Sequence, residues 1–201
     1  MKRTASMADV VKPLSECPSQ AYLSNAVQVA DLLEWILEQV GTAKVWQTSF
    51  SISEEFLRRL FFIEKGGKVS EFNLVLDHKA TNKTLKLWSF MTQVIERTYL
   101  TNNHSKILLV QAENGQTVSV ITSQNLTRGN RHESAFISTD AAIFTTLHAE
   151  ITDLINNHSV PLYDLFRQRI DEALLIKGEP SSRITLPKEQ ILHVWVGMLQ
   201  R

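Results

Sequence analysis

The feature that most constrains the fold is a regular alternation of helix-like and strand-like segments in the first half of the chain. The helical segments carry apolar side chains at helical spacing, and the strand segments are rich in β-branched and aromatic residues. In chain order these segments are 24–40, 44–52, 53–65, 68–76 and 84–97. Strands separated by single helices favour a parallel sheet with right-handed crossovers. We therefore expect an α/β domain with functional residues at the carboxyl ends of its strands.

The pattern changes after residue 97. Asn114-Gly115 lies between two apolar runs, which is a strong signal for a β-hairpin. The sequence predicts further strands and then two helices, at 98–100, 106–112, 117–122, 135–138, 140–156 and 161–176. The predicted fold class is α/β, with a mixed sheet flanked by helices and a C-terminal helical extension.

Three regions follow from these patterns. Residues 1–20 mix charged residues, serine and proline without periodicity, which indicates a flexible lead-in. Residues 21–158 form the predicted α/β domain. Residues 159–201 form the predicted helical extension, which we expect to pack on the same domain.

Composition excludes several classes of function. The 201 residues include 21 basic and 21 acidic side chains, so no global field attracts nucleic acid or an anionic membrane. No apolar run approaches the roughly 18 residues of a spanning helix. The N-terminus lacks the apolar region of a secretory signal, so we expect a cytoplasmic protein without membrane association. The single cysteine, Cys17, has no local catalytic base, and His148, His158 and His193 have no metal-ligand spacing.

One group of side chains can handle a phosphodiester without metal or cofactor. His104 can attack phosphorus as a neutral imidazole, while Lys106 and Asn125 can hold the non-bridging oxygens. The two-residue spacing from His104 to Lys106 places both on one face of a strand, and Ser123 and Asn125 repeat this spacing. A hairpin turning at Asn114-Gly115 opposes His104 to Asn125 and Lys106 to Ser123.

These residues resemble the motif of the phospholipase D superfamily, which is H-x-K, four residues and aspartate, then G-S-x-N. Here the chain reads His104-Ser105-Lys106, then Thr122-Ser123-Gln124-Asn125, with Glu133 where members often carry a glutamate. Gln111 stands in place of the aspartate, and Thr122 in place of the glycine. The resemblance is specific over residues 98–138.

The resemblance implies a role for each matching residue. His104 would form a phosphohistidine intermediate, and Lys106 and Asn125 would bind the phosphoryl oxygens beside a supporting Ser123. Glu133 would accept a hydrogen bond from the His104 ring and fix its tautomer. Members use two copies of the motif, whereas this chain has one. The resemblance therefore implies a homodimer whose two-fold interface holds the site.

Two further clusters carry weaker signals. Arg128, Arg131 and His132 follow the asparagine and can contact a substrate phosphate, although a solvated loop would look the same. Asp77 and its two basic neighbours follow a predicted parallel strand, where ligand contacts are common, but a surface loop is the simpler interpretation.

The function predicted from the sequence is a metal-independent phosphodiesterase, acting on nucleic acid, DNA included, through a homodimer. Nucleic acid is favoured over phospholipid because no amphipathic membrane-docking segment is evident. The alternative is a catalytically silent dimeric module that binds nucleic acid or protein, which the change to Gln111 favours. A phosphohistidine transferase has no support beyond the histidine itself.

Overall fold

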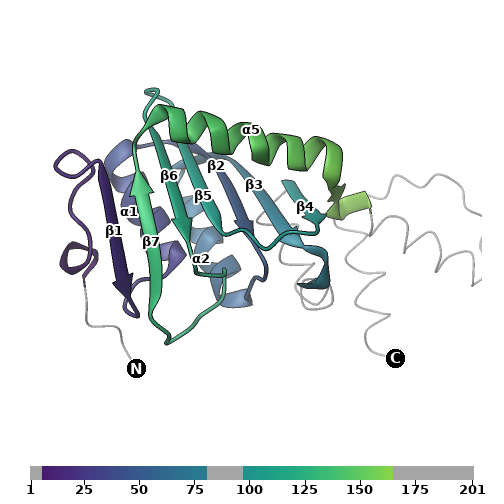
Figure 1. Cartoon of the computed structure of the whole chain (residues 1–201), viewed down its shortest axis with the longest axis horizontal. Helices are drawn as coiled ribbons and strands as arrows, with labels where there is room; N and C mark the ends of the chain where they lie inside the picture. The colour runs from purple at the N-terminus through teal and green to yellow at the C-terminus, as the bar shows by residue number, and fades with distance from the viewer. Residues whose placement is uncertain (1–5, 81–96, 165–201) are drawn as a thin grey trace, which may run out of the picture. The chain divides into compact units, whose positions relative to one another are not determined.

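In the computed structural model the described residues are 6–80 and 97–164, and the chain divides into two compact units, Met1–Pro161 and Leu162–Arg201. Within the described part of the first unit, eight strands form one mixed sheet (Figure 1). Across the sheet they are β1 Ser19–Ser24, β7 Glu133–Ser138, β6 Thr117–Thr122, β5 Ile107–Ala112, β2 Ala43–Ser49, β3 Val69–Asp77, β4 Arg97–Thr101 and β8 Val160–Pro161. Strands β2, β3 and β4 are parallel, and the other neighbouring pairs are antiparallel. The mixed sheet confirms the predicted fold class.

Helices α1 (Val29–Val40) and α2 (Glu54–Lys65) cover one face of the sheet (Figure 1). The apolar positions of α1 recur every three or four residues, so one stripe of the helix is buried against the strands. Gly41 ends α1 with φ +83°, a conformation that a residue without a Cβ adopts at no steric cost. The Ser53 hydroxyl caps α2 by accepting a hydrogen bond from a main-chain N–H of its first turn.

Helix α5 (Ala141–His158) crosses the opposite face of the sheet (Figure 1). Asp140 caps it by accepting hydrogen bonds from two main-chain N–H groups of its first turn. One long helix covers less of a sheet than two helices do, so the core between α5 and the sheet is small. The buried residues of this core are Trp46, Val75, Leu109, Phe144 and Ile151.

The structure contains elements that the sequence does not predict. Residues 6–20 include a short 3-10 helix, Met7–Asp9, and the buried side chains of Val11 and Leu14. Strand β1 starts at Ser19, so the predicted domain boundary at residue 21 falls inside a strand. Its polar sequence lacks a clear alternation, and only its pairing with β7 identifies it as a strand.

Two of the predicted helices lie mostly outside the described residues. The segment 84–97 lies almost entirely outside the described residues, and so does most of 161–176 together with the predicted helical extension. Elsewhere, β2, α2, β3, β5, β6 and α5 lie where the sequence predicts them.

The register of the β5–β6 hairpin differs by one residue from the prediction. Its loop has three residues, Glu113–Gly115, because the Ala112 N–H donates to the carbonyl of Gln116, 2.9 Å away. Gly115 has φ +87°, as the last residue of such a loop requires. Ile107 therefore lies opposite Ile121, and the predicted pairing of His104 with Asn125 and of Lys106 with Ser123 is wrong.

Candidate functional site

The predicted site residues lie just beyond the regular strands, except for Glu133, which is the first residue of β7. Strand β5 begins at Ile107 and β6 ends at Thr122, and the carboxyl end of β2 lies beside the first of these. We call this region the open end of the hairpin; it comprises residues 48–49, 103–106 and 122–126. The opposite end, residues 111–117, is the turn end. Because β2, β3 and β4 are parallel, their carboxyl ends share the edge of the sheet at which the open end lies.

A buried hydrogen-bond network centred on Asn103 holds the segment that carries His104. The Asn103 side-chain oxygen accepts from the Ser105 N–H at 3.0 Å and from the Ser105 hydroxyl at 2.6 Å. The Ser105 hydroxyl also lies 2.8 Å from the Thr48 hydroxyl of β2. The Asn103 side chain donates in turn to the carbonyl of Ser49, 3.4 Å away. Since both neighbours of His104 are fixed, the backbone on either side of the nucleophile candidate is fixed as well.

Asp77, the last residue of β3, holds this network in place through the main chain of Asn103. Its side chain is 2% exposed and accepts hydrogen bonds from the main-chain N–H groups of Lys79 at 2.8 Å and Asn103 at 3.0 Å. The interpretation of Asp77 as part of a surface loop is therefore wrong. A buried carboxylate is stable here because two N–H donors satisfy it. Sequence reasoning also missed Asn103, although its position directly before His104 was a usable signal.

His104 itself is exposed, and its ring lies against the ring of Phe50 with the centroids 5.2 Å apart. The Lys106 ammonium donates to the main-chain carbonyl of His104, 2.8 Å away. Burial lowers the pKa of Lys106, the charge of Glu133 raises it, and the net result lies below the ordinary value for lysine. Lys106 therefore lies within electrostatic reach of both His104 and Glu133.

Asn125 is held between two buried neighbours. The Gln124 side chain donates to the carbonyl of Val27 at 2.7 Å, and the Leu126 N–H donates to the Ser49 hydroxyl at 3.1 Å. The Asn125 side-chain oxygen lies 3.5 Å from the same Ser49 hydroxyl. Ser49 thus links the segment of Asn125 to the carboxyl end of β2, beside the network that holds His104.

Glu133, the first residue of β7, is hydrogen-bonded to the Ser123 hydroxyl. The Ser123 hydroxyl also accepts from the Ser134 N–H at 3.0 Å. Within residues 6–80 and 97–164, no hydrogen bond joins the His104 ring to Glu133. The structure therefore brings Ser123, Glu133 and Lys106 together, and the predicted hydrogen bond between the His104 ring and Glu133 stays a prediction.

The two departures from the motif lie at different ends of the hairpin. Gln111 is exposed near the turn, five residues after Lys106, which at about 3.3 Å per residue is roughly 16 Å along the strand. Thr122 lies at the open end, where its hydroxyl donates to the carbonyl of Ser134 at 2.8 Å and accepts from the Gln124 N–H at 3.1 Å. Within the described residues no φ outside glycine is positive, so the backbone at Thr122 does not require glycine.

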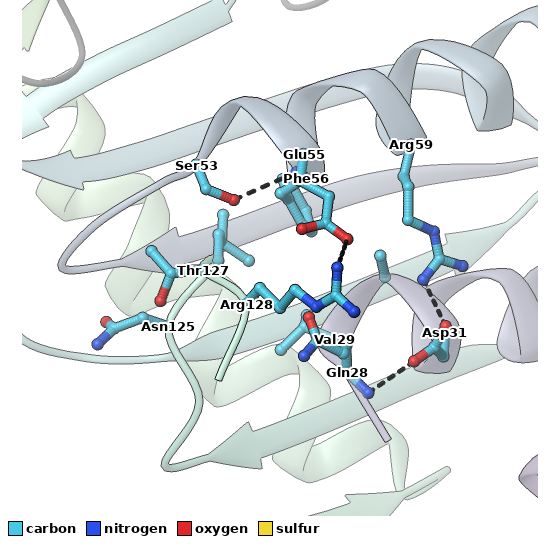
Figure 2. A pocket seen from close by; sticks show the side chains of 12 residues that line it. Gln28, Val29, Asp31, Ser53, Glu55, Phe56, Arg59, Asn125, Thr127 and Arg128 are labelled. Carbon is cyan, nitrogen blue, oxygen red and sulfur yellow. Dashed lines mark hydrogen bonds and ion pairs between the residues drawn. The ribbon is translucent and has the colours of Figure 1, made fainter. Parts of the chain in front are cut away.

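A pocket of about 400 Å³ lies beside Asn125, between the amino ends of α1 and α2 (Figure 2). Arg128 lines it and forms an exposed ion pair with Glu55, 3.2 Å away, so this predicted substrate contact is paired in the free protein. On another wall, Arg59 is bonded to Asp31 of α1. Arg131 is exposed in the same loop as Arg128.

Arg59 ties the two helices together through Asp31 and Glu34. Burial lowers its pKa, but the hydrogen bond and charge of Asp31, with those of Glu34, raise it, and the net pKa lies above the ordinary value. Arg59 is therefore a permanent cation whose charge is already balanced by two carboxylates.

Exposed apolar side chains border the open end on the face that α5 crosses. Ile121 of β6 lies directly opposite Phe136 of β7, and their exposed fractions are 45% and 38%. Leu23 of β1, 71% exposed, lies two residues beyond the partner of Phe136 on the same face. We call Leu23, Ile121 and Phe136 the apolar strip. Contiguous exposed apolar surface of this kind marks interaction sites.

Two features are absent from residues 6–80 and 97–164. No group of three or more histidine, cysteine or acidic side chains is arranged to hold a metal ion. No helix in that part of the chain has the length and apolar character needed to cross a membrane.

Comparisons with solved structures identify the fold. The chain is similar to Nuc of Salmonella typhimurium, described as a phospholipase D family member, at 14% identity and a TM-score of 0.54, covering 70% of this chain and 95% of Nuc. It is also similar to NucT of Helicobacter pylori, at 10% identity and a TM-score of 0.52, covering 72% of this chain and 98% of NucT. A third similar structure is the phosphatidylserine synthase of Haemophilus influenzae, at 12% identity and a TM-score of 0.52. The match covers 76% of this chain and 40% of the synthase, so this chain spans less than half of that larger protein. No protein-family model matches the sequence. No curated protein matches it either.

Proposed function

We propose that this chain, which has the fold of the phospholipase D superfamily, is a metal-independent phosphodiesterase that cleaves nucleic acid through a phosphohistidine intermediate. One observation carries the proposal: His104, Lys106, Asn125 and Glu133 all emerge at one end of the β5–β6 hairpin. They reach it from three different segments of the chain. Their chemistry is that of a nucleophile, a cation, an amide donor and a carboxylate, which is the set that one protomer contributes to this reaction.

The reaction takes two steps. In the first, a ring nitrogen of His104 attacks phosphorus, a P–N bond forms, and the P–O bond to the leaving group breaks. The leaving oxygen takes a proton from the imidazolium of the partner's His104. In the second step water attacks phosphorus, gives its proton to the partner's His104, and the P–N bond breaks. Lys106 and Asn125 stabilise the charge that develops on the non-bridging oxygens in both steps.

A homodimer supplies the second histidine. The apolar strip of Leu23, Ile121 and Phe136 borders the open end, so a partner seated on it would lie next to the site. The match covers 95% of the Nuc chain and 98% of the NucT chain, so each of these chains holds one domain of this fold. Burying the strip would give the dimer an apolar contact beside its shared site.

Nucleic acid is the diester that the surroundings of the site favour. Arg128 and Arg131 both lie in the loop after Asn125. Arg131 is exposed and can contact a phosphate that flanks the scissile one, whereas Arg128 is paired with Glu55. The fold alone does not decide the substrate, because it also occurs in a phosphatidylserine synthase.

One observation favours the alternative of a silent binding module. Glu133 is bonded to Ser123 rather than to the His104 ring, so the tautomer of His104 has no partner that fixes it within the described residues. If substrate does not move Glu133 to the ring, the fold would keep its phosphate pocket without turnover.

The two functions are separated by incubating the protein with DNA, RNA and bis(4-nitrophenyl) phosphate in excess EDTA. We expect cleavage that His104→Ala abolishes and that His158→Ala, an exposed histidine on α5, leaves intact. Intact-mass analysis of rapidly quenched reactions should show a phosphoryl adduct on the wild type and on His158→Ala, and none on His104→Ala. Binding of DNA without turnover of any diester, equal in the wild type and His104→Ala, would establish the silent module instead.

A further inference from the structure

The pocket beside Asn125 is open next to the proposed reaction site, and the proposed mechanism makes no use of it. Asn125 lines the pocket together with Thr127 and Arg128 (Figure 2). A smaller crevice shares these three residues and also touches Glu133. The pocket is therefore close enough to Asn125 to take one of the two ester groups of a phosphate that Asn125 holds.

The volume of the pocket, about 400 Å³, suits a ring system with a sugar. It lies within the range of about 300–1,000 Å³ that is usual for small-molecule sites. The alcohols of common phospholipid head groups are much smaller than this space. A duplex would have to unstack a base before that base could enter a pocket, whereas an unpaired nucleotide pays no such cost.

The charges on the walls identify the chemistry of the occupant. Arg59 is paired with Asp31, and Arg128 is paired with Glu55, so the two cations of the pocket are already balanced (Figure 2). A second phosphate would gain no uncompensated positive charge here. An acyl chain would have to lie against four charged side chains, which disfavours a lipid tail. A neutral group rich in hydrogen-bond donors and acceptors fits best.

Polar groups with free hydrogen-bonding capacity surround an apolar floor. Thr127 is exposed, and the Ser53 hydroxyl, which accepts from the Phe56 N–H, still has its own O–H to donate (Figure 2). Val29 and Phe56 supply the buried apolar surface between them. A heterocyclic base, which is flat and apolar on its faces and polar at its edges, has this same distribution of surface.

We propose that the pocket is a nucleoside subsite, which receives the sugar and base of the nucleotide attached to the scissile phosphate. The proposal rests on the proposed phosphodiesterase function and specifies its substrate as a nucleotidyl diester. The exposed pair of Arg128 and Glu55 contacts the polar edge of the nucleoside. Exposed ion pairs contribute little stability, so either side chain can exchange its partner for the ligand at small cost.

The test compares two diesters with the same leaving group, thymidine 5′-(4-nitrophenyl phosphate) and methyl 4-nitrophenyl phosphate. Only the nucleoside distinguishes them, so the ratio of their kcat/KM values reports on the pocket. We expect the wild type to prefer the thymidine ester by about tenfold or more, the discrimination typical of one well-filled pocket. Thr127→Trp, which fills the pocket from its exposed edge, should bring the ratio close to one.

Asn130→Trp is the matched control, because it adds the same bulk to the same loop at a residue that does not line the pocket. It should keep the wild-type ratio. Equal rates for the two esters in the wild type, or equal ratios in the two tryptophan variants, would overturn the subsite while leaving the phosphodiesterase intact. Faster cleavage of dihexanoylphosphatidylcholine than of the thymidine ester would overturn it as well.

If the wild type cleaves neither ester, the proposed function fails, and the subsite is tested by binding alone. Isothermal titration calorimetry with thymidine 5′-(methyl phosphate) then provides the readout. Binding that is lost in Thr127→Trp and kept in Asn130→Trp would support the subsite. No binding to the wild type at millimolar ligand would overturn it.

Discussion

The two ends of the β5–β6 hairpin are built on different physical principles. At the turn end, main-chain hydrogen bonds and one glycine with φ +87° fix the loop Glu113–Gly115, and the side chain of Asn114 adds one acceptor for the Gln116 N–H. At the open end the strands have stopped, and side chains such as Asn103 and Ser49 hold the backbone instead. A main-chain turn tolerates most changes of side chain, whereas a network of side chains does not. Function should therefore be sensitive to substitution at the open end and insensitive at the turn end.

The largest expected effect comes from a substitution that separates the two protomers of the proposed dimer at the open end. Phe136→Glu places a charge in the apolar strip, so the dimer should dissociate and the partner's His104 should no longer protonate the leaving group. Loss of a general acid would lower kcat on the order of 1,000-fold. Light scattering and turnover of bis(4-nitrophenyl) phosphate measure the two consequences on one sample.

Phe62→Glu is the control for Phe136→Glu. Phe62 is 70% exposed on α2, which covers the other face of the sheet, and the substitution introduces the same charge. It should leave both mass and kcat unchanged. A monomeric Phe136→Glu variant with full activity would show that one protomer holds a complete site.

The next effect tests whether side chains alone hold the open end. Asn103→Ala removes the acceptor that fixes Ser105 and frees the segment of His104. A nucleophile displaced by about 1 Å can cost on the order of 100-fold in rate, so we expect a large fall in kcat with little change in KM. Stopped-flow and steady-state kinetics on the nitrophenyl diester provide the measurement.

Asn73→Ala controls for the general cost of losing a buried amide. Asn73 is buried in β3 and bonded to Glu71, away from the open end. Both variants should lose about 1–3 kcal/mol of unfolding free energy, but only Asn103→Ala should lose activity. The milder Ser105→Ala should give an intermediate kcat. Equal activity of the two alanine variants would mean that the network only stabilises the fold.

The same contrast explains which parts of the structure the sequence predicts. Helices and strands with strong periodicity, such as α2 and β5, lie where the pattern indicates, because local burial decides them. The hairpin is also predicted, but its register is wrong by one residue. Asn-Gly indicates a turn without deciding whether the loop has two residues or three, and one residue of difference changes every pair along the ladder.

The sequence predicts which kinds of residue make up the candidate site, but it does not predict how they are held in place. His104, Lys106 and Asn125 are recognisable because their residue types and spacing match a reaction. Asp77 and Asn103 are not, because a carboxylate or amide becomes a buried anchor only when distant N–H groups meet it. The pocket beside Asn125 is likewise formed by three segments that no local pattern connects.

A smaller effect concerns the charges at the open end. Lys106 binds the phosphoryl oxygens only while protonated, so activity should fall as pH rises through its pKa. Burial lowers that pKa and Glu133 raises it, so Glu133→Gln removes the opposing influence and lowers the pKa further. The basic limb of the plot of log kcat against pH should therefore move to lower pH.

Glu113→Gln makes the same change of charge at the turn end, where the side chain is exposed. Its pH profile should coincide with that of the wild type. A basic limb that stays in place in Glu133→Gln would mean that Lys106 is not the group that titrates there.

The smallest effect is expected where this chain departs most visibly from the motif. Gln111→Asp restores the aspartate, but the residue is exposed and roughly 16 Å along β5 from Lys106, beyond the Debye length of about 8 Å at physiological salt. We expect kcat/KM to change by less than about twofold, which is the limit set by such a screened charge. Thr122→Gly restores the other motif residue, at the open end, and should lower activity rather than raise it. It removes the hydroxyl that joins Gln124 to the carbonyl of Ser134, so the segment of Asn125 loosens and kcat falls. Gain of activity in Gln111→Asp would show that the turn end communicates with the site and that the contrast between the two ends is wrong.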